Sequence, residues 1–208
     1  MPSSSNRRRV EIPTFMYERI QAIAAAEPRT LTSVITELLH WGIEHYHPVW
    51  VESRDLDRFN ERARHALDRA RAEAVSLQHD YVGTEHVLAG LAEEEGGVAA
   101  DVLRSLGVTP DRVRRAIEQH FGRGSEPVTE ILGFTARVRV VLGLALEEAE
   151  QMGGGPARTE HILLAMVRYG GGLGPDLLDE IGVLADVRRE TLERLGRPLL
   201  EPGGRRKD

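Results

Sequence analysis

The stretch YVGTEHVLAGLAEEEGGVAADVLRSLGV (residues 81–108) is followed by a related one, ARTEHILLAMVRYGGGLGPDLLDEIGV (residues 157–183). Both contain the triplet Thr-Glu-His directly before an apolar run, at Thr84-Glu85-His86 and at Thr159-Glu160-His161, an offset of 75 (159 minus 84). At this offset the two copies align from Phe59 and Phe134 to Gly107 and Gly182. The chain therefore contains an internal structural repeat.

Each copy is predicted to fold as four helices. Apolar residues at steps of three and four mark the first helix of copy one: Phe59, Ala63, Ala66, Ala70, Ala74 and Leu77. Thr84 is predicted to cap a second helix, which carries Val87, Leu88 and Leu91. A third helix carries Val98, Val102 and Leu106 and ends at Gly107.

The fourth helix of copy one is predicted to begin at Thr109-Pro110, with proline at the first helical position. Its apolar face consists of Val113, Ile117 and Phe121. In copy two, Pro175 is predicted to open the third helix and Gly182 to end it. Neither copy shows sustained two-residue alternation, so this part of the chain is predicted to be all-α.

The pattern divides the chain into three regions. Residues 1–50 form an N-terminal element, residues 51–197 form the repeat domain, and residues 198–208 are predicted to be a flexible tail. Within the repeat domain, repeat one covers 55–122, a linker covers 123–133, and repeat two covers 134–197.

Composition excludes several classes of function. The 208 residues include no cysteine, so disulfides, thiolate nucleophiles and cysteine metal sites are absent. Lys207 is the single lysine and no Gly-Lys pair occurs, which excludes a phosphate-binding P-loop. No run approaches the ~18 apolar residues of a membrane helix, and no signal-peptide core precedes the repeat. A cytoplasmic, non-enzymatic protein without cofactors or membrane contacts is expected.

Residues 59–108, FNERARHALDRARAEAVSLQHDYVGTEHVLAGLAEEEGGVAADVLRSLGV, closely resemble the Clp repeat, the N-terminal domain of Clp-family AAA+ unfoldases such as ClpC. The segments FTARVRVVLGLALEEAEQ and TEHILLAMV of copy two resemble it as well. The resemblance implies a pseudo-twofold domain of two four-helix repeats. The ATPase modules that normally follow it are absent from this sequence.

The triplets allow two interpretations. A glutamate in the first turn of a helix complements the helix dipole, which is a purely structural role. Alternatively, the carboxylate and the free backbone amides together suit a ligand that carries phosphate on a guanidinium. In ClpC-type proteins the glutamates at these positions bind phosphoarginine, and the resemblance implies this role for Glu85 and Glu160.

The resemblance also implies ligand contacts at Thr84, Thr159, Phe59, Asn60, Phe134 and Thr135. The same face receives cyclic-peptide antibiotics in ClpC-type proteins, with an aromatic side chain at the Phe134 position among the contacts. Copy one reads LQHDYVGTEH, close to the family pattern, whereas copy two reads MGGGPARTEH. The family threonine after the first phenylalanine is replaced by Asn60 in copy one, whereas Thr135 keeps it in copy two. The shapes of both pockets are therefore expected to depart from the family. A metal site at His79, Glu85 and His86 is the weaker alternative, because these residues lack helical ligand spacing and copy two has Gly154 in place of His79.

Residues 7–46, RRRVEIPTFMYERIQAIAAAEPRTLTSVITELLHWGIEHY, resemble the ribbon-helix-helix family of bacterial DNA-binding proteins. The resemblance implies a short strand followed by two helices, and a homodimer formed through residues 1–50. The residues expected to contact DNA are Arg7, Arg9, Glu11, Thr32 and Ser33. Residues 1–50 hold five Arg and five Glu, which weakens electrostatic attraction to DNA, so a dimerisation element without DNA binding is the alternative.

Together these features predict a stand-alone Clp-repeat protein that binds phosphoarginine-marked proteins or Clp-targeting cyclic peptides. It would act as a decoy or sensor, and as a ligand-responsive repressor that binds its own promoter. The alternative is an adaptor or modulator that docks on a Clp unfoldase and does not bind DNA.

Overall fold

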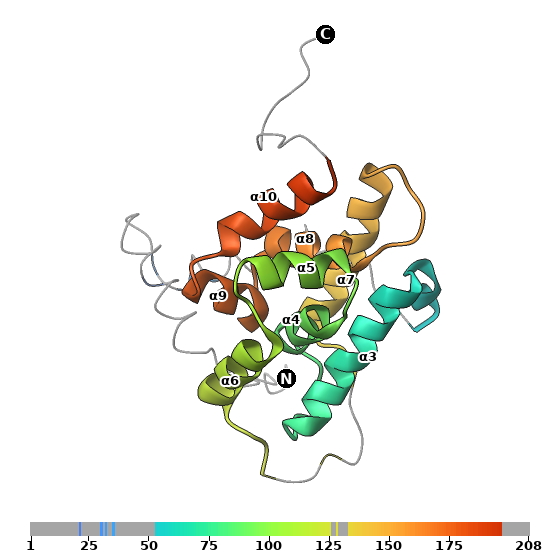
Figure 1. The fold of residues 1–208 in the computed structure, drawn as a ribbon. Coiled ribbons are helices and arrows are strands. Elements are labelled where there is room, and N and C mark those ends of the chain that lie inside the picture. The colour runs from blue at the N-terminus through green and yellow to red at the C-terminus, as the bar shows by residue number, and fades with distance from the viewer. Residues whose placement is uncertain are drawn as a thin grey trace, which may run out of the picture. The chain divides into compact units, whose positions relative to one another are not determined.

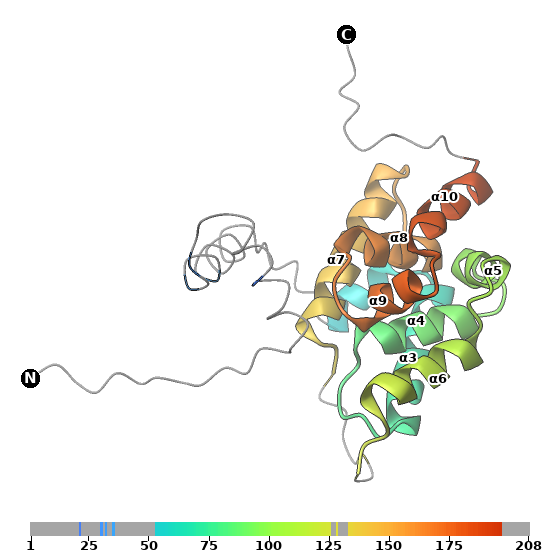
Figure 2. The same cartoon turned by 90° about the vertical axis from the view of Figure 1, so that its left-hand side faces the viewer.

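The computed structural model describes residues 53–125, 128 and 133–196, together with Gln21, Thr30, Thr32 and Ile35. The chain divides into two units after Pro48. Within its described residues, the second unit consists of a short 3-10 helix, η1, and eight α-helices (Figures 1 and 2): η1 (Ser53–Arg58), α3 (Glu61–Ser76), α4 (Thr84–Glu93), α5 (Val98–Ser105), α6 (Pro110–Phe121), α7 (Ala136–Gln151), α8 (Thr159–Tyr169), α9 (Leu173–Glu180) and α10 (Leu184–Arg194).

The helices form two repeats of four, as the sequence predicted. Helices α3–α6 make up repeat one and α7–α10 make up repeat two. The first three helices of the two repeats begin 75 residues apart, at Glu61 and Ala136, Thr84 and Thr159, and Val98 and Leu173. The described residues contain isolated β-bridges but no strand. The all-α prediction for the repeat domain is confirmed.

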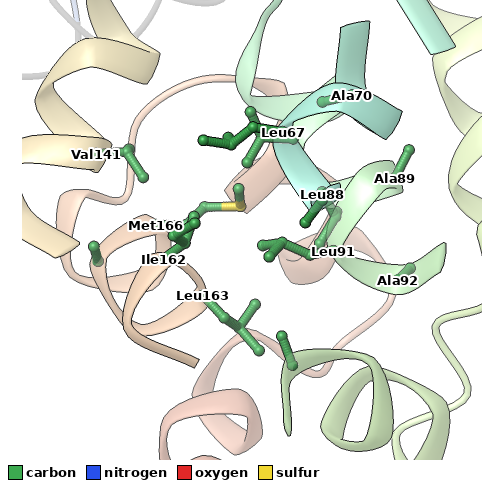
Figure 3. Close-up of a cluster of buried hydrophobic side chains, with 14 of the residues drawn as sticks. Leu67, Ala70, Leu88, Ala89, Leu91, Ala92, Val141, Ile162, Leu163 and Met166 are labelled. Atoms are coloured by element: carbon green, nitrogen blue, oxygen red, sulfur yellow. The ribbon is translucent and has the colours of Figure 1, made fainter. Parts of the chain in front are cut away.

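Helices α4 and α8 form the centre of the domain. Every residue from Thr84 to Ala92 is buried, and so is every residue from Thr159 to Met166. A helix that is covered on all sides is mostly apolar around its whole circumference, which accounts for the apolar runs behind both triplets. Figure 3 shows side chains of α4 and α8 gathered in one cluster with a leucine of α3: Leu67, Leu88, Leu91, Ile162, Leu163 and Met166. The predicted stripe from Phe59 to Leu77 is buried as well.

Two isolated parallel bridges connect the repeats, Phe59 with Ala157 and Val82 with Phe134. Asn60 N–H donates to the Ala157 carbonyl at 2.8 Å, and Thr135 N–H donates to the Val82 carbonyl at 3.0 Å. The two bridges are equivalent at the offset of 75. They place the start of α3 beside the start of α8, and the start of α7 beside the start of α4.

Local predictions at helix ends were confirmed between α5 and α6 but failed at the start of α9. Thr109 caps α6 with Pro110 as its first residue, and Gly107 follows α5 with a φ of +73°. Helix α9, however, begins at Leu173, two residues before the predicted Pro175. Phe121 was predicted to face the core, yet it is 56% exposed at the end of α6.

Predictions for residues 1–50 fall largely outside the described residues. This applies to Arg7, Arg9, Glu11 and Ser33, and to the strand-helix-helix element as a whole. Thr32 is described as an exposed residue in helical conformation. Within the part of the chain that the structure describes, every helix is too short or too polar to cross a lipid bilayer.

Candidate functional site

Both Thr-Glu-His triplets begin a central helix, but the threonines are not the caps. Gly83 is the N-cap of α4 and Arg158 is the N-cap of α8, so the predicted cap at Thr84 was wrong by one residue. The histidines complete the helix ends instead. The N–H of Gly83 donates to Nδ1 of His86 at 2.9 Å, and the N–H of Arg158 donates to Nδ1 of His161 at 3.0 Å. This is the reverse half of a capping box.

The threonines tie the two repeats together. Gly174 N–H, in the first turn of α9, donates to Thr84 Oγ1 at 3.1 Å, and Ala99 N–H, in the first turn of α5, donates to Thr159 Oγ1 at 3.5 Å. Each hydroxyl in turn donates to the glutamate that follows it, at 3.5 Å for Glu85 Oε2 and 3.3 Å for Glu160 Oε2. A hydroxyl can donate once and accept twice, so each threonine caps a foreign helix and orients a carboxylate.

Glu85 and Glu160 are almost completely buried, at 4% and 3% exposure. Burial disfavours the carboxylate and raises the pKa of Glu85 above its ordinary value, although the Glu85 amide, the Thr84 hydroxyl and the charge of Arg137 partly offset this. Among the described residues, neither glutamate forms an ion pair with an arginine. Each carboxylate is thus held at a helix start, and no arginine of the described ranges is paired with it.

Glu85 faces a cavity of about 300 Å³ between the repeats. Repeat one contributes Tyr81, Gly83, Thr84, Glu85 and Phe121 to its walls, and repeat two contributes Thr135, Arg137 and Leu173. We call this space the Glu85 cavity. It combines a buried carboxylate, an exposed arginine and an aromatic wall.

Glu160 faces a second cavity of about 300 Å³. Its walls come from Asn60, Arg62, Gly96, Gly97 and Val98 of repeat one and from Pro156, Arg158, Thr159 and Glu160 of repeat two. We call it the Glu160 cavity. Seven wall positions correspond at the offset of 75: Asn60 and Thr135, Arg62 and Arg137, Tyr81 and Pro156, Gly83 and Arg158, Thr84 and Thr159, Glu85 and Glu160, and Val98 and Leu173. The domain thus holds two related cavities, each completed by the opposite repeat.

The family of the Clp repeat (R) N-terminal domain matches residues 58–181 and 133–202 of this sequence. The chain belongs to this family. Over 140 residues the Clp repeat region is 39% identical to ClpC/MecB of Bacillus subtilis, a negative regulator of genetic competence, and 39% identical to the chaperone ClpB of Oceanobacillus iheyensis. These matches cover 67% of this chain but 17% of each relative.

Solved Clp N-domains have the same fold. The N-terminal domain of ClpD from Arabidopsis thaliana is 28% identical, with a TM-score of 0.57 over 67% of this chain and 99% of that one. The ClpV N-domain in complex with a VipB peptide is 25% identical, with a TM-score of 0.52 over 72% of this chain and 92% of that one. The matched region is a substrate-binding module in these proteins, not a catalytic one.

The other predicted ligand contacts divide into two pairs in the Clp repeat domain. Asn60 and Thr135 line the cavities, and both are N-caps: Ala63 N–H donates to Asn60 Oδ1 at 2.9 Å, and Val138 N–H donates to Thr135 Oγ1 at 3.4 Å. The two phenylalanines are not among the cavity walls.

Phe59 is fully buried in the core, so it cannot contact a ligand as predicted without repacking. Phe134 is half-buried, and the Arg71 guanidinium lies over its ring, 4.5 Å from the centroid. The side chains of Phe59 and Phe134 therefore contribute to packing, whereas the shorter polar side chains of Asn60 and Thr135 line the cavities.

Sequence reasoning missed the arginines of the cavities. Arg62 and Arg137 are 75 residues apart, so the repeat itself marked them, but their role depends on the opposite repeat. Tyr81, Phe121 and Leu173, which form the apolar wall of the Glu85 cavity, were likewise not predicted to meet.

His79 and His86 form a hydrogen-bonded pair behind the Glu85 cavity. His86 Nε2 lies 3.0 Å from His79 Nδ1, and His79 Nε2 lies 3.2 Å from the Gly122 carbonyl. Because His86 Nδ1 accepts from Gly83 N–H, His86 must donate through Nε2, and His79 must then donate to Gly122. Both rings are neutral in this arrangement.

Burial and the neighbouring His79 lower the pKa of His86 to about 3. The 3.4 Å approach of His86 Nδ1 to Glu85 Oε1 is therefore not an ion pair at neutral pH. The described residues contain no group of three His, Cys, Asp or Glu side chains placed to hold a metal ion. The nitrogens of His79 and His86 act in the fold, as a bridge from α4 to the end of α6.

Proposed function

We propose that this Clp repeat domain binds phosphoarginine side chains, one in each cavity between the repeats, and so captures proteins that carry this mark. The observation that carries the proposal is the pairing in each cavity of a buried carboxylate from one repeat with an arginine from the other: Glu85 with Arg137, and Glu160 with Arg62.

Phosphoarginine needs both signs of charge in one small space. Its guanidinium group donates hydrogen bonds that suit a carboxylate, and its phosphoryl oxygens suit an arginine and free helix amides. A carboxylate without a bound arginine is ready to accept the ligand's guanidinium, since no ion pair has to be broken first. The 39% identity to ClpC/MecB over the Clp repeat region adds independent support.

Two related roles compete with this one. Binding of cyclic peptides at Phe134 has less support, because Arg71 covers that ring. An adaptor role on a Clp unfoldase uses the same domain, and the ClpV N-domain forms a complex with a VipB peptide. We infer that capture of the mark in these two cavities lets the domain serve as a decoy or sensor for phosphoarginine-bearing proteins.

Titration with N-acetyl-phosphoarginine amide in a calorimeter tests the proposal. We expect the wild type to bind the probe and the Glu85→Gln, Glu160→Gln double variant to bind at least about thirtyfold more weakly, since removing one partner of a buried charged pair costs ~2–5 kcal/mol. Equal affinities for the two proteins would remove these carboxylates from the binding site.

The double variant is expected to stay folded, because glutamine has nearly the same shape. Burial raises the pKa of Glu85, so the ionised carboxylate costs stability at neutral pH, and a neutral amide at residue 85 removes this cost. The thermal midpoint of the Glu85→Gln variant should therefore equal or exceed that of the wild type at pH 7.5. An exposed matched control is Glu95→Gln, which should change neither affinity nor midpoint.

For residues 1–50 we propose dimerisation and binding to DNA through Arg7, Arg9 and Glu11, supported by the resemblance of this segment to ribbon-helix-helix proteins. In a mobility-shift assay, the 208-residue chain should retard a fragment of its own promoter, and an Arg7→Ala, Arg9→Ala variant should not. Loss of two phosphate or base contacts also lowers the dependence of affinity on salt. Unchanged retardation by the variant would leave these arginines without a role in DNA binding.

A further inference from the structure

The two cavities differ where the repeats differ in sequence. At the N-cap, Gly83 in repeat one corresponds to Arg158 in repeat two, and two residues earlier Tyr81 corresponds to Pro156. The Glu85 cavity therefore has an aromatic wall and one arginine. The Glu160 cavity has two arginines and no aromatic side chain among its described walls.

Arg158 adds a second positive charge to the walls of the Glu160 cavity. Its side chain is exposed, and among the described residues its guanidinium has no hydrogen-bond or ion-pair partner. Arg62, in contrast, donates to the Glu95 carbonyl at 2.7 Å and lies 3.9 Å from Glu94 Oε1. A ligand in this cavity thus meets two guanidinium groups and the single carboxylate of Glu160.

The N-cap residue also changes the space open to the carboxylate. A Cβ added at Gly83 would lie 2.1 Å from Oε1 of Glu85, so the Glu85 side chain folds back over the glycine. Arg158 carries a Cβ at the equivalent place, which closes that position to the carboxylate of Glu160. The Glu85 carboxylate can therefore lie directly over its N-cap residue, Gly83, whereas the Glu160 carboxylate cannot take the same position over Arg158.

The aromatic wall of the Glu85 cavity is fixed by its neighbours. The Tyr81 ring stacks on His79, with centroids 5.5 Å apart, and Phe121 meets His79 edge-on at 6.5 Å. Tyr81 and Phe121 are therefore presented as a preformed surface beside Glu85. A guanidinium bonded to Glu85 can lie against such a surface and gain cation–π attraction.

We propose that the two cavities select different forms of arginine: the Glu160 cavity binds only the phosphorylated side chain, whereas the Glu85 cavity also binds the unmodified one. This rests on the proposed function, since both cavities are taken as arginine side-chain sites. In the Glu160 cavity an unmodified guanidinium meets the like charges of Arg158 and Arg62, while a phosphoryl group turns both into partners. In the Glu85 cavity the carboxylate and aromatic rings suit a bare guanidinium.

Single-site variants of the full chain test this selection. Glu160→Gln leaves the Glu85 cavity to be measured, and Glu85→Gln leaves the Glu160 cavity. Each is titrated with N-acetyl-phosphoarginine amide and with N-acetyl-arginine amide. We expect the two probes to bind within about tenfold of each other in Glu160→Gln. In Glu85→Gln we expect the unmodified probe to bind at least about thirtyfold more weakly than the phosphorylated one.

The role of Arg158 is tested in the Glu85→Gln background. Arg158→Gly installs the residue of repeat one and should reduce the preference for phosphorylated probe to that of the Glu85 cavity. Arg158→Lys keeps the charge and should keep the preference, which separates charge from a structural effect of the substitution.

These measurements separate failure of the proposed function from failure of the proposed selection between the cavities. If the wild type binds neither probe, the proposed function fails, and this inference fails with it. If the wild type binds phosphoarginine but both single-site variants show the same ratio of affinities, the selection is overturned while the proposed function stands. An unchanged ratio in Arg158→Gly overturns the assignment of selection to Arg158.

Discussion

Substituting Gly90 by alanine should destabilise the domain by about 3 kcal/mol. An alanine in a helix interior normally stabilises by ~0.5–1 kcal/mol relative to glycine, so the expected sign is reversed here. An added Cβ at residue 90 would lie 2.1 Å from the carbonyl oxygen of Ala66 and 2.8 Å from the nitrogen of Ala70.

Those atoms belong to the backbone of α3, which cannot move aside as a side chain does. Helices α3 and α4 would have to separate, which would loosen the packing of the buried core to which Leu67 and Leu88 belong. Urea unfolding followed by circular dichroism at 222 nm measures the change. A Gly90→Ala variant as stable as the wild type would mean that α3 and α4 do not approach this closely.

The second repeat offers a matched comparison. Ala165 stands at the position equivalent to Gly90, on α8, and is fully buried. The reverse substitution Ala165→Gly should cost about 1 kcal/mol through lost helix propensity. Clearly unequal effects of the two substitutions would show that the first helix pair is packed more closely than the second.

Acidification from pH 7.5 to pH 5 should remove about 2 kcal/mol of stability through His86 alone. The pKa of His86 is about 3 in the fold, where burial and His79 oppose its protonation, against 6.5 for an ordinary histidine. Below pH 6.5 the unfolded chain therefore binds a proton that the folded chain does not. The contribution of neutral His86 to the free energy of unfolding is therefore fully present well above pH 6.5. It falls by ~1.4 kcal/mol per pH unit as the pH drops from 6.5 toward 3.

Other groups near this site titrate with the opposite sign. The raised pKa of Glu85 means that its burial costs less as the pH falls, so the Glu85→Gln variant is the better background for the measurement. The pKa of His120 is also raised, by the Ala116 carbonyl and by Glu180, but this group is exposed and its effect on stability is screened.

Urea unfolding at several pH values between 5 and 7.5 gives the slope directly. In the Glu85→Gln background, His86→Asn should flatten it while lowering stability at pH 7.5, because the hydrogen bonds to Gly83 and His79 are disturbed. The same free energy of unfolding at pH 5 and pH 7.5 in that background would contradict a neutral, buried His86.

Local chemistry made much of the fold predictable. The offset of 75 and the apolar spacing predicted the eight α-helices that the structure describes in the repeat domain. Gly107, Thr109 and Pro110 marked a helix end and a helix start through interactions within a few residues. Thr84 misled the prediction because its partner is the amide of Gly174, in the other repeat. The sequence alone does not distinguish a threonine that caps the helix in which it lies from a threonine that caps a helix of the other repeat.

The candidate site was predictable only in part, for the same reason. Glu85 and Glu160 stood out through the repeated triplet and the family resemblance. In each cavity the arginine that adds positive charge comes from the opposite repeat: Arg137 in the Glu85 cavity, and Arg62 in the Glu160 cavity. Phe121 fitted an inward-facing helical stripe, yet it lies at the last turn of α6, where the core ends and a cavity begins.

The paired bridges of Phe59 with Ala157 and Val82 with Phe134 make the two halves of the domain interdependent. A half produced by itself would lack the chain that satisfies the backbone at Asn60 or Thr135, and would contain no complete cavity. Two fragments expressed side by side, each carrying one half, would together supply every wall residue of both cavities. Exchange of halves between two molecules would preserve every one of these contacts, so domain swapping is compatible with complete cavities in this architecture.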